Sequence, residues 1–203
     1  GAAHSRRRSR RRRARRGWRG RDLARSEHGG IVSLAMQRAA PAGISRSALM
    51  ETNGQAEMPN VAAAREPQIV RVKSGRLEAV MRDEMKPNYL APGPRRLEVL
   101  NTVMEMALDL GPEVFVRQSR ALQRRPDQQG TLRRAKLPAL ILCGEHDALC
   151  PVRRHEFMAH LMPNAVLRII PEAGHLPTLE RPRLVTDLLR RWLSSPDPSP
   201  LSA

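Results

Sequence analysis

Short apolar runs in the C-terminal part of the chain predict two buried strands. Residues 139–143 form an unbroken apolar run, as a strand covered on both faces requires, and residues 165–170 form a second run. Between them, Pro151 opens a helix whose apolar stripe includes Phe157 and Leu161. This order of strand, helix and strand predicts parallel strands whose carboxyl ends meet at one edge of a sheet.

The remaining pattern is mostly helical. Apolar positions recur at three- and four-residue steps in several segments that are bounded by glycine or proline. The predicted helices span residues 29–39, 69–85 with an interruption at Gly75, 95–110, 113–124 and 181–193. Residues 44–53 predict one further, weaker strand, because three polar residues dilute its apolar positions. The elements together predict an α/β fold class.

Two side chains with useful chemistry follow the two predicted buried strands. Asp147 lies in the turn after residues 139–143, and His175 lies in the turn after residues 165–170. Open α/β sheets build their sites at this edge. A carboxylate that orients an imidazole there is two thirds of an acyl-transfer triad. The alternative is structural, with Asp147 capping the helix at Pro151 and His175 merely occupying a turn.

The two turns resemble those of the α/β-hydrolase superfamily. The residues that carry the resemblance are GEHDALCP at 144–151 and PEAGHLPTLERP at 171–182. The resemblance implies a partial α/β-hydrolase fold, a short parallel sheet flanked by helices with a helical cap at about residues 54–136. It implies that Asp147 is the triad acid and His175 the general base. The implied substrate is a small-molecule ester or acyl compound.

The nucleophile turn of that superfamily is altered in this sequence. The superfamily places G-x-S-x-G at a sharp turn between a strand and a helix, and the glycine pair at 29–30 marks the matching helix. This alignment puts Glu27 where the serine belongs, leaves Ser26 one residue early and lacks the first glycine. Residues 20–25 predict no buried strand. Ser26 remains the candidate nucleophile, and we expect Glu27 to pair with His175 rather than attack a carbonyl.

Other polar and sulfur-containing residues have two interpretations each. Glu51 ends the strand predicted at residues 44–53, where some members of the superfamily carry an acid, and it is either a second-choice acid or a turn residue. Methionines in the cap region either line a pocket or fill a helical core; they are Met81, Met104 and Met106. A C-x2-H-x3-C-x4-H set is rejected as a zinc site because its spacing is unusual and one cysteine ends a buried strand; its members are Cys143, His146, Cys150 and His155. We expect no metal and no cofactor.

The net charge of +16 is concentrated at the start of the chain. Residues 1–25 hold twelve arginines and a single acid, Asp22, and few apolar residues. We expect this tail to be disordered, residues 26–193 to form the domain, and residues 194–203 to be a second disordered end. The tail is either a nucleic-acid-binding arm or a segment without that function, which is a solvated tail or a start outside the natural gene product. We favour the second interpretation and expect no nucleic-acid binding elsewhere in the chain.

The sequence supports three hypotheses about function. The first is an N-terminally truncated α/β hydrolase, whose ancestor cleaved an ester, acyl or carbon–carbon bond by a Ser-His-Asp mechanism, and which is inactive as this chain. The second is a non-catalytic interaction protein that keeps the cap and sheet, and the third is nucleic-acid binding through the tail. Only three of about eight strands are predicted. With no long apolar run and no signal peptide, the expected location is cytoplasmic and not a membrane.

Overall fold

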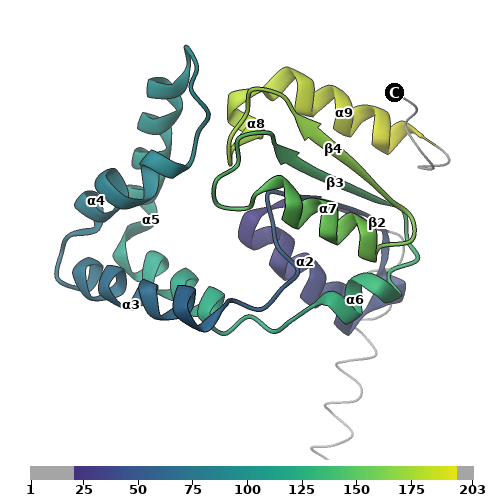
Figure 1. Ribbon diagram of the computed structural model, residues 1–203, viewed down its shortest axis with the longest axis horizontal. Helices are drawn as coiled ribbons and strands as arrows, with labels where there is room; N and C mark the ends of the chain where they lie inside the picture. Colours follow the sequence, from purple (N-terminus) through teal and green to yellow (C-terminus); the bar gives the residue numbers. More distant parts are fainter. Residues whose placement is uncertain (1–20, 196–203) are drawn as a thin grey trace, which may run out of the picture.

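The computed structural model describes residues 21–195 and is built around a parallel sheet (Figure 1). Its strands lie side by side in chain order, and each pairs in parallel with the next. The strands are β1 (Arg21–Ser26), β2 (Ile44–Met50), β3 (Ala139–Gly144) and β4 (Ala165–Ile170). All carboxyl ends therefore meet at one edge of the sheet. The predicted fold class, a partial α/β-hydrolase fold with a short parallel sheet between helices, is confirmed.

Strand β1 corrects two of the sequence predictions. We assigned residues 21–25 to a disordered tail and expected three strands, but Arg21–Ser26 forms a fourth strand that pairs with β2. Five of its six residues are exposed because it lies at the edge of the sheet. An edge strand is defined by its hydrogen bonds to a neighbour and needs no apolar run. Residues 1–20 and 196–203, which we expected to be disordered, lie outside the described residues.

Helices cover both faces of the sheet (Figure 1). One face carries α2 (Glu27–Ala39), α6 (Gln129–Arg134) and α7 (Val152–Leu161), and the other carries α9 (Pro182–Ser194). Successive residues of β3 point to opposite faces. Ile141 belongs to the apolar cluster on the first face, whereas Leu140 and Leu142 belong to the clusters under α9. Trp192 of α9 is fully buried against Leu140.

A second, helical layer is inserted between β2 and β3. It contains α3 (Pro59–Lys73), α4 (Leu77–Val80), a π-helical turn η2 (Met81–Met85), a 3-10 turn η3 (Lys86–Asn88) and α5 (Arg96–Gln123). These elements have an apolar cluster of their own, which includes Val72, Val80 and Val103. We call this layer the cap. Figure 1 shows α3, α4 and α5 beside the sheet layer, with the chain returning to the sheet through α6.

The breaks predicted inside the cap are present. Helix α5 is bent at Gly111, where φ is 78°, so the two predicted helices appear as one kinked helix. Helix α3 ends at Lys73, and Gly75 has a φ of 84° before α4 begins. Short helical turns complete the fold: η1 (Pro41–Gly43) and α8 (Pro177–Glu180).

Among residues 21–195, no helix combines the length and apolar character that crossing a bilayer requires.

Candidate active site

The turns after β3 and β4 bring Asp147 and His175 together, as the sequence predicted. Strands β3 and β4 pair in register from Ala139 with Ala165 to Gly144 with Ile170, so both turns leave the same edge of the sheet. The Nδ1 atom of His175 lies 2.8 Å from Oδ2 of Asp147. Both side chains are almost completely removed from solvent. The pair therefore has the arrangement of an acid that orients a catalytic imidazole.

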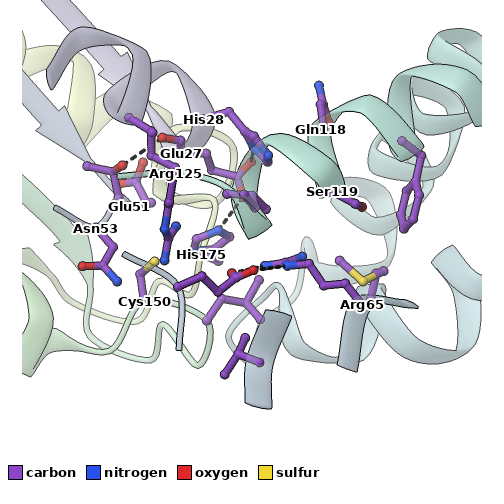
Figure 2. A pocket seen from close by; sticks show the side chains of 18 of the residues that line it. Glu27, His28, Glu51, Asn53, Arg65, Gln118, Ser119, Arg125, Cys150 and His175 are labelled. Carbon is purple, nitrogen blue, oxygen red and sulfur yellow. Dashed lines mark hydrogen bonds and ion pairs between the residues drawn. The ribbon is translucent and has the colours of Figure 1, made fainter. Parts of the chain in front are cut away.

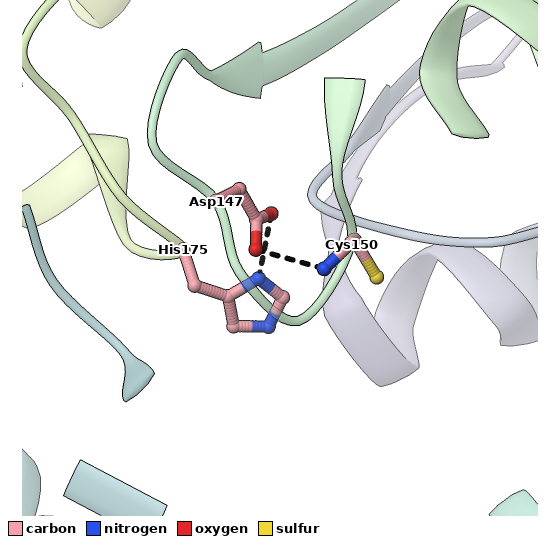
Figure 3. A group of neighbouring side chains, drawn as sticks. All are labelled: Asp147, Cys150 and His175. Carbon is pink, nitrogen blue, oxygen red and sulfur yellow. Dashed lines mark hydrogen bonds and ion pairs between the residues drawn. The ribbon is translucent and has the colours of Figure 1, made fainter. Parts of the chain in front are cut away.

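The turn that follows β3 fixes the carboxylate of Asp147. Its Oδ1 atom accepts hydrogen bonds from the backbone N–H groups of Leu149 (2.9 Å) and Cys150 (2.8 Å). Its Oδ2 atom is thereby left to His175 (Figure 3). Because each carboxylate oxygen has a partner, the acid is oriented before any ligand arrives.

The turn that carries His175 is held by the cap and by Glu180. The backbone N–H of His175 donates to the carbonyl oxygen of Tyr89 at 2.6 Å, and the two aromatic rings stack with centroids 6.1 Å apart. The carboxylate of Glu180 accepts from the backbone N–H groups of Gly174 (2.9 Å), Leu176 (3.1 Å) and Ala91 (2.9 Å). The cap segment at residues 89–91 is therefore part of the support of the histidine.

Glu27 occupies the turn between β1 and α2 and contacts His175. Its φ is 47°, in the left-handed region that a residue other than glycine seldom adopts, and such strain concentrates at functional turns. The carboxylate of Glu27 forms an ion pair with Nε2 of His175. Its second oxygen lies 3.7 Å from Nδ1 of His28. The expected pairing of Glu27 with His175 is confirmed.

Ser26, the candidate nucleophile, has a different environment. It is exposed, ends β1 opposite Met50 of the β2 ladder, and is not among the residues that line the cavity described below. The structure thus brings Asp147, His175 and Glu27 together, and it places Ser26 outside that group.

The contacts among Glu27, His175 and Asp147 favour the charged forms of Glu27 and His175. Burial by itself raises the pKa of Glu27, but the hydrogen bonds with His175 and His28 outweigh it and lower the pKa to about 2. Burial by itself lowers the pKa of His175, but the bonds with Asp147 and Glu27 raise it to about 10. At neutral pH the imidazole is therefore doubly protonated and donates one N–H to each carboxylate.

Glu51 is buried next to this group without joining it. It follows β2, has a φ of 44° and is only 2% exposed. Its Oε1 atom has no hydrogen-bond partner, and burial raises the pKa of Glu51 to about 9. At neutral pH it is a neutral carboxylic acid. Asp147, rather than the second-choice acid, is the one that contacts His175.

A cavity of about 730 Å³ lies between the sheet edge and the cap, and His175, Glu27 and Glu51 line it. In Figure 2, Arg65, Gln118 and Ser119 lie on the cap side of the cavity, across from Glu27 and Glu51. Of the three cap methionines, Met81 lines the cavity, Met104 packs into the cap core and Met106 is exposed. The volume suits a small organic ligand.

The sulfur and histidine ligands of the rejected zinc set do not converge in the described part of the chain. The group that does converge is Asp147, Cys150 and His175, with ligand atoms within 4.8 Å of one another (Figure 3). Both oxygens of Asp147 already accept hydrogen bonds, one of them from His175. Burial raises the pKa of Cys150 to about 12. A metal would have to break the acid–imidazole pair and remove a proton from a buried thiol, so these residues do not fit one.

Sequence reasoning missed several residues that shape the cavity. Arg125, Arg154 and Tyr89 line it from the segment after α5, the first turn of α7 and the segment after η3. No local pattern marks them, because each lies in or beside a loop whose position depends on how the cap folds back onto the sheet.

Comparisons with known proteins agree with this arrangement. A family model described as the alpha/beta hydrolase family matches residues 23–188. Protein ABHD8 of Homo sapiens is 38% identical over 65 residues, which cover 32% of this chain and 15% of that protein. The biotin biosynthesis bifunctional protein BioHC of Teredinibacter turnerae is 35% identical over 72 residues, 36% of this chain and 13% of that protein. The matches thus span a small part of these curated relatives.

Solved structures resemble most of the chain. A thermophilic esterase from Thermogutta terrifontis, solved with malate bound, has a TM-score of 0.79 and 28% identity, covering 85% of this chain and 64% of its own. The enol-lactonase from Burkholderia xenovorans LB400 has a TM-score of 0.74 and 20% identity, covering 88% of this chain and 67% of its own. The second similarity concerns the fold alone. The chain spans just under two thirds of the length of the esterase.

Proposed function

This chain belongs to the alpha/beta hydrolase family, and on that basis we propose that its cavity binds a small ester or related acyl compound while Glu27 keeps the site from hydrolysing it. In this proposal Asp147 orients His175, and His175 is the general base of the family's reaction. The observation that carries the proposal is the ion pair between the Glu27 carboxylate and Nε2 of His175. That nitrogen is the one that must accept a proton from a nucleophile.

The chemistry of Glu27 opposes ester hydrolysis. A serine hydroxyl becomes a nucleophile by giving its proton to the imidazole, but an ionised carboxylate has no proton to give. With a pKa of about 2, Glu27 is also a weak nucleophile towards a carbonyl carbon and would be a good leaving group. Because His175 already carries both ring protons, it has no lone pair with which to activate a water molecule.

The test is to restore the missing nucleophile. In Glu27→Ser, the new hydroxyl lies at the turn that faces His175, and the pKa of the imidazole is no longer raised by a carboxylate on Nε2. We expect Glu27→Ser to hydrolyse a short-chain nitrophenyl ester roughly 10²-fold faster than Glu27→Ala. The gain should vanish in Glu27→Ser with His175→Ala. The native chain should hydrolyse the ester slowly and at the same rate with or without His175→Ala.

Two results would count against this proposal. One is a Glu27→Ser variant with a native circular dichroism spectrum but no gain in rate. The other is rapid turnover by the native chain that His175→Ala removes, because a working nucleophile would then be present. Ser26→Ala would show whether Ser26 is that nucleophile.

A further inference from the structure

Two arginines line the cavity without a carboxylate partner. Arg125 follows the C-terminal end of α5, and Arg154 lies in the first turn of α7; both border the cavity. Within residues 21–195, no salt bridge or side-chain hydrogen bond involves either guanidinium, and Nε of Arg125 is buried without any partner. An arginine that loses water without gaining a partner is costly, so such groups mark places where a ligand completes the pairing.

The two guanidinium groups lie near each other and near Cys150. Burial is the main cause that lowers the pKa of Arg125; the charge of Glu57 raises it, and the charges of Arg65 and Arg154 lower it. Both arginines in turn lower the pKa of the Cys150 thiol against the larger effect of its burial. Figure 2 shows Arg125 beside Cys150, on the same side of the cavity as Glu27. Both arginines therefore lie near Cys150, whose sulfur is within 4.8 Å of ligand atoms of Asp147 and His175.

The carboxylates that line the cavity have other partners, and one of them, Asp127, accepts hydrogen bonds from the backbone N–H (2.9 Å) and the side-chain amide (2.8 Å) of Gln129. Glu27 pairs with His175, Glu57 pairs with Arg65 through two contacts of 2.8 Å, and Glu84 pairs with Arg71 at 2.8 Å. Glu51 is protonated at neutral pH. Within residues 21–195, none of these acids forms a salt bridge or hydrogen bond with the guanidinium group of Arg125 or Arg154.

The amino end of helix α7 adds to the positive charge near the two arginines. Helix α7 has ten residues, and its first turn contains no acidic side chain. The amino end of a helix carries a partial positive charge and favours an anion. Arg154 in this first turn is on the unfavourable side of that dipole. An anion in the cavity would be stabilised by the helix end and by both guanidinium groups.

We propose that Arg125 and Arg154 form a subsite for a carboxylate, so that the acyl ligand of this cavity is a monoester of a dicarboxylic acid. The inference rests on the proposed function for the ester end of the ligand, which lies towards His175. The free carboxylate lies at Arg125 and Arg154, where planar guanidinium groups match its two oxygens. A neutral diester has the same ester chemistry but leaves both arginines unpaired.

Binding to the native 203-residue chain tests the subsite without turnover. Isothermal titration calorimetry would compare monomethyl glutarate, dimethyl glutarate and inorganic phosphate. We expect the monoester to bind at least roughly 10-fold more tightly than the diester. Arg125→Gln and Arg154→Gln should each weaken monoester binding by roughly 10-fold or more and leave diester binding unchanged. The matched control is Arg124→Gln, which makes the same change of charge at the exposed neighbouring residue outside the cavity and should have no effect.

A melting curve separates loss of binding from loss of folding. Without ligand, Arg125→Gln should melt at the same temperature as the native chain or higher, because it removes a half-buried guanidinium whose Nε lacks a hydrogen-bond partner. Equal affinities for the monoester and the diester would overturn the subsite, as would unchanged monoester binding in Arg125→Gln or tighter binding of phosphate than of the monoester.

The subsite and the proposed function can fail separately. If Glu27→Ser hydrolyses neutral esters but Arg125→Gln binds the monoester as tightly as the native chain does, the subsite is wrong and the proposed function stands. If Arg125→Gln weakens monoester binding but Glu27→Ser is inactive, the subsite stands and the proposed function is wrong.

Discussion

The imidazole of His175 lies between two carboxylates, with Asp147 on Nδ1 and Glu27 on Nε2. The two acids lie 120 positions apart, Glu27 at the start of α2 and Asp147 in the turn after β3. An imidazole held on both sides in this way is stabilised as the cation and has no nitrogen free to act as a base. Asp147 and His175 carry the resemblance to a hydrolase, whereas Glu27 occupies the imidazole nitrogen that the proposed reaction would need.

The pKa of His175 should depend on Glu27. We expect Glu27→Gln to lower the pKa of His175 from about 10 by at least about 1 pH unit, because a neutral amide replaces a carboxylate on Nε2. Titration of the ring protons of His175 by NMR measures this shift. Asp147→Asn should lower the same pKa independently. A pKa of His175 that stays the same in Glu27→Gln would mean that the ion pair is absent in solution.

The same pair predicts how stability varies with pH. The folded pKa of His175 lies above its ordinary value of 6.5, so its contribution is complete below pH 6.5 and is lost as the pH rises towards 10. The folded pKa of Glu27 lies below its ordinary value of 4.5, so its contribution is complete above pH 4.5 and is lost as the pH falls towards 2. Urea denaturation should show the largest contribution of the pair between pH 4.5 and 6.5, and a flatter profile in Glu27→Gln.

Glu51 should destabilise the protein increasingly as the pH rises. Its folded pKa of about 9 lies above the ordinary 4.5, so between these values the folded state holds a proton that the unfolded state releases. Stability then falls with rising pH across this range. Glu51→Gln removes the titration, and its free energy of unfolding relative to the native chain should increase from pH 5 to pH 8 by about 1–3 kcal/mol. A difference between the two proteins that is independent of pH would show that Glu51 is ionised or exposed in solution.

Gly144 should tolerate no side chain. It ends β3, and a Cβ atom there would overlap the backbone of Ala173 and Gly174, in the turn that carries His175. We expect Gly144→Ala to lower the free energy of unfolding by at least about 1–3 kcal/mol, because backbone rather than a flexible side chain must move. Urea denaturation followed by circular dichroism measures the loss. The matched control is Gly93→Ala, where a Cβ atom would meet nothing within 4 Å and stability should be unchanged. Equal stabilities of the two variants would show that the two turns are not in contact.

The sequence by itself determined the part of the fold in which local pattern and burial coincide. Strand β3 reads as a buried strand because all six of its residues are buried, and the turns after β3 and β4 carry Asp147 and His175 at fixed places in the chain. Since parallel strands joined by a helix end at the same edge, these positions already implied that the two side chains meet. The sequence alignment that puts Glu27 at the position of the family's serine likewise depends only on its spacing to the following glycines.

Tertiary structure decided the features that depend on which distant segments touch. Strand β1 has no apolar alternation, and its residues are extended only because β2 offers a ladder for them to join. Glu51 is a neutral acid rather than a turn carboxylate because the cap and the sheet together exclude water from it. Arg125 and Arg154 line the same cavity although 29 positions separate them, because the chain returns from the cap to the edge of the sheet between them. Local periodicity indicates whether a position is buried, but it does not indicate which charged side chains from distant parts of the chain lie next to that position.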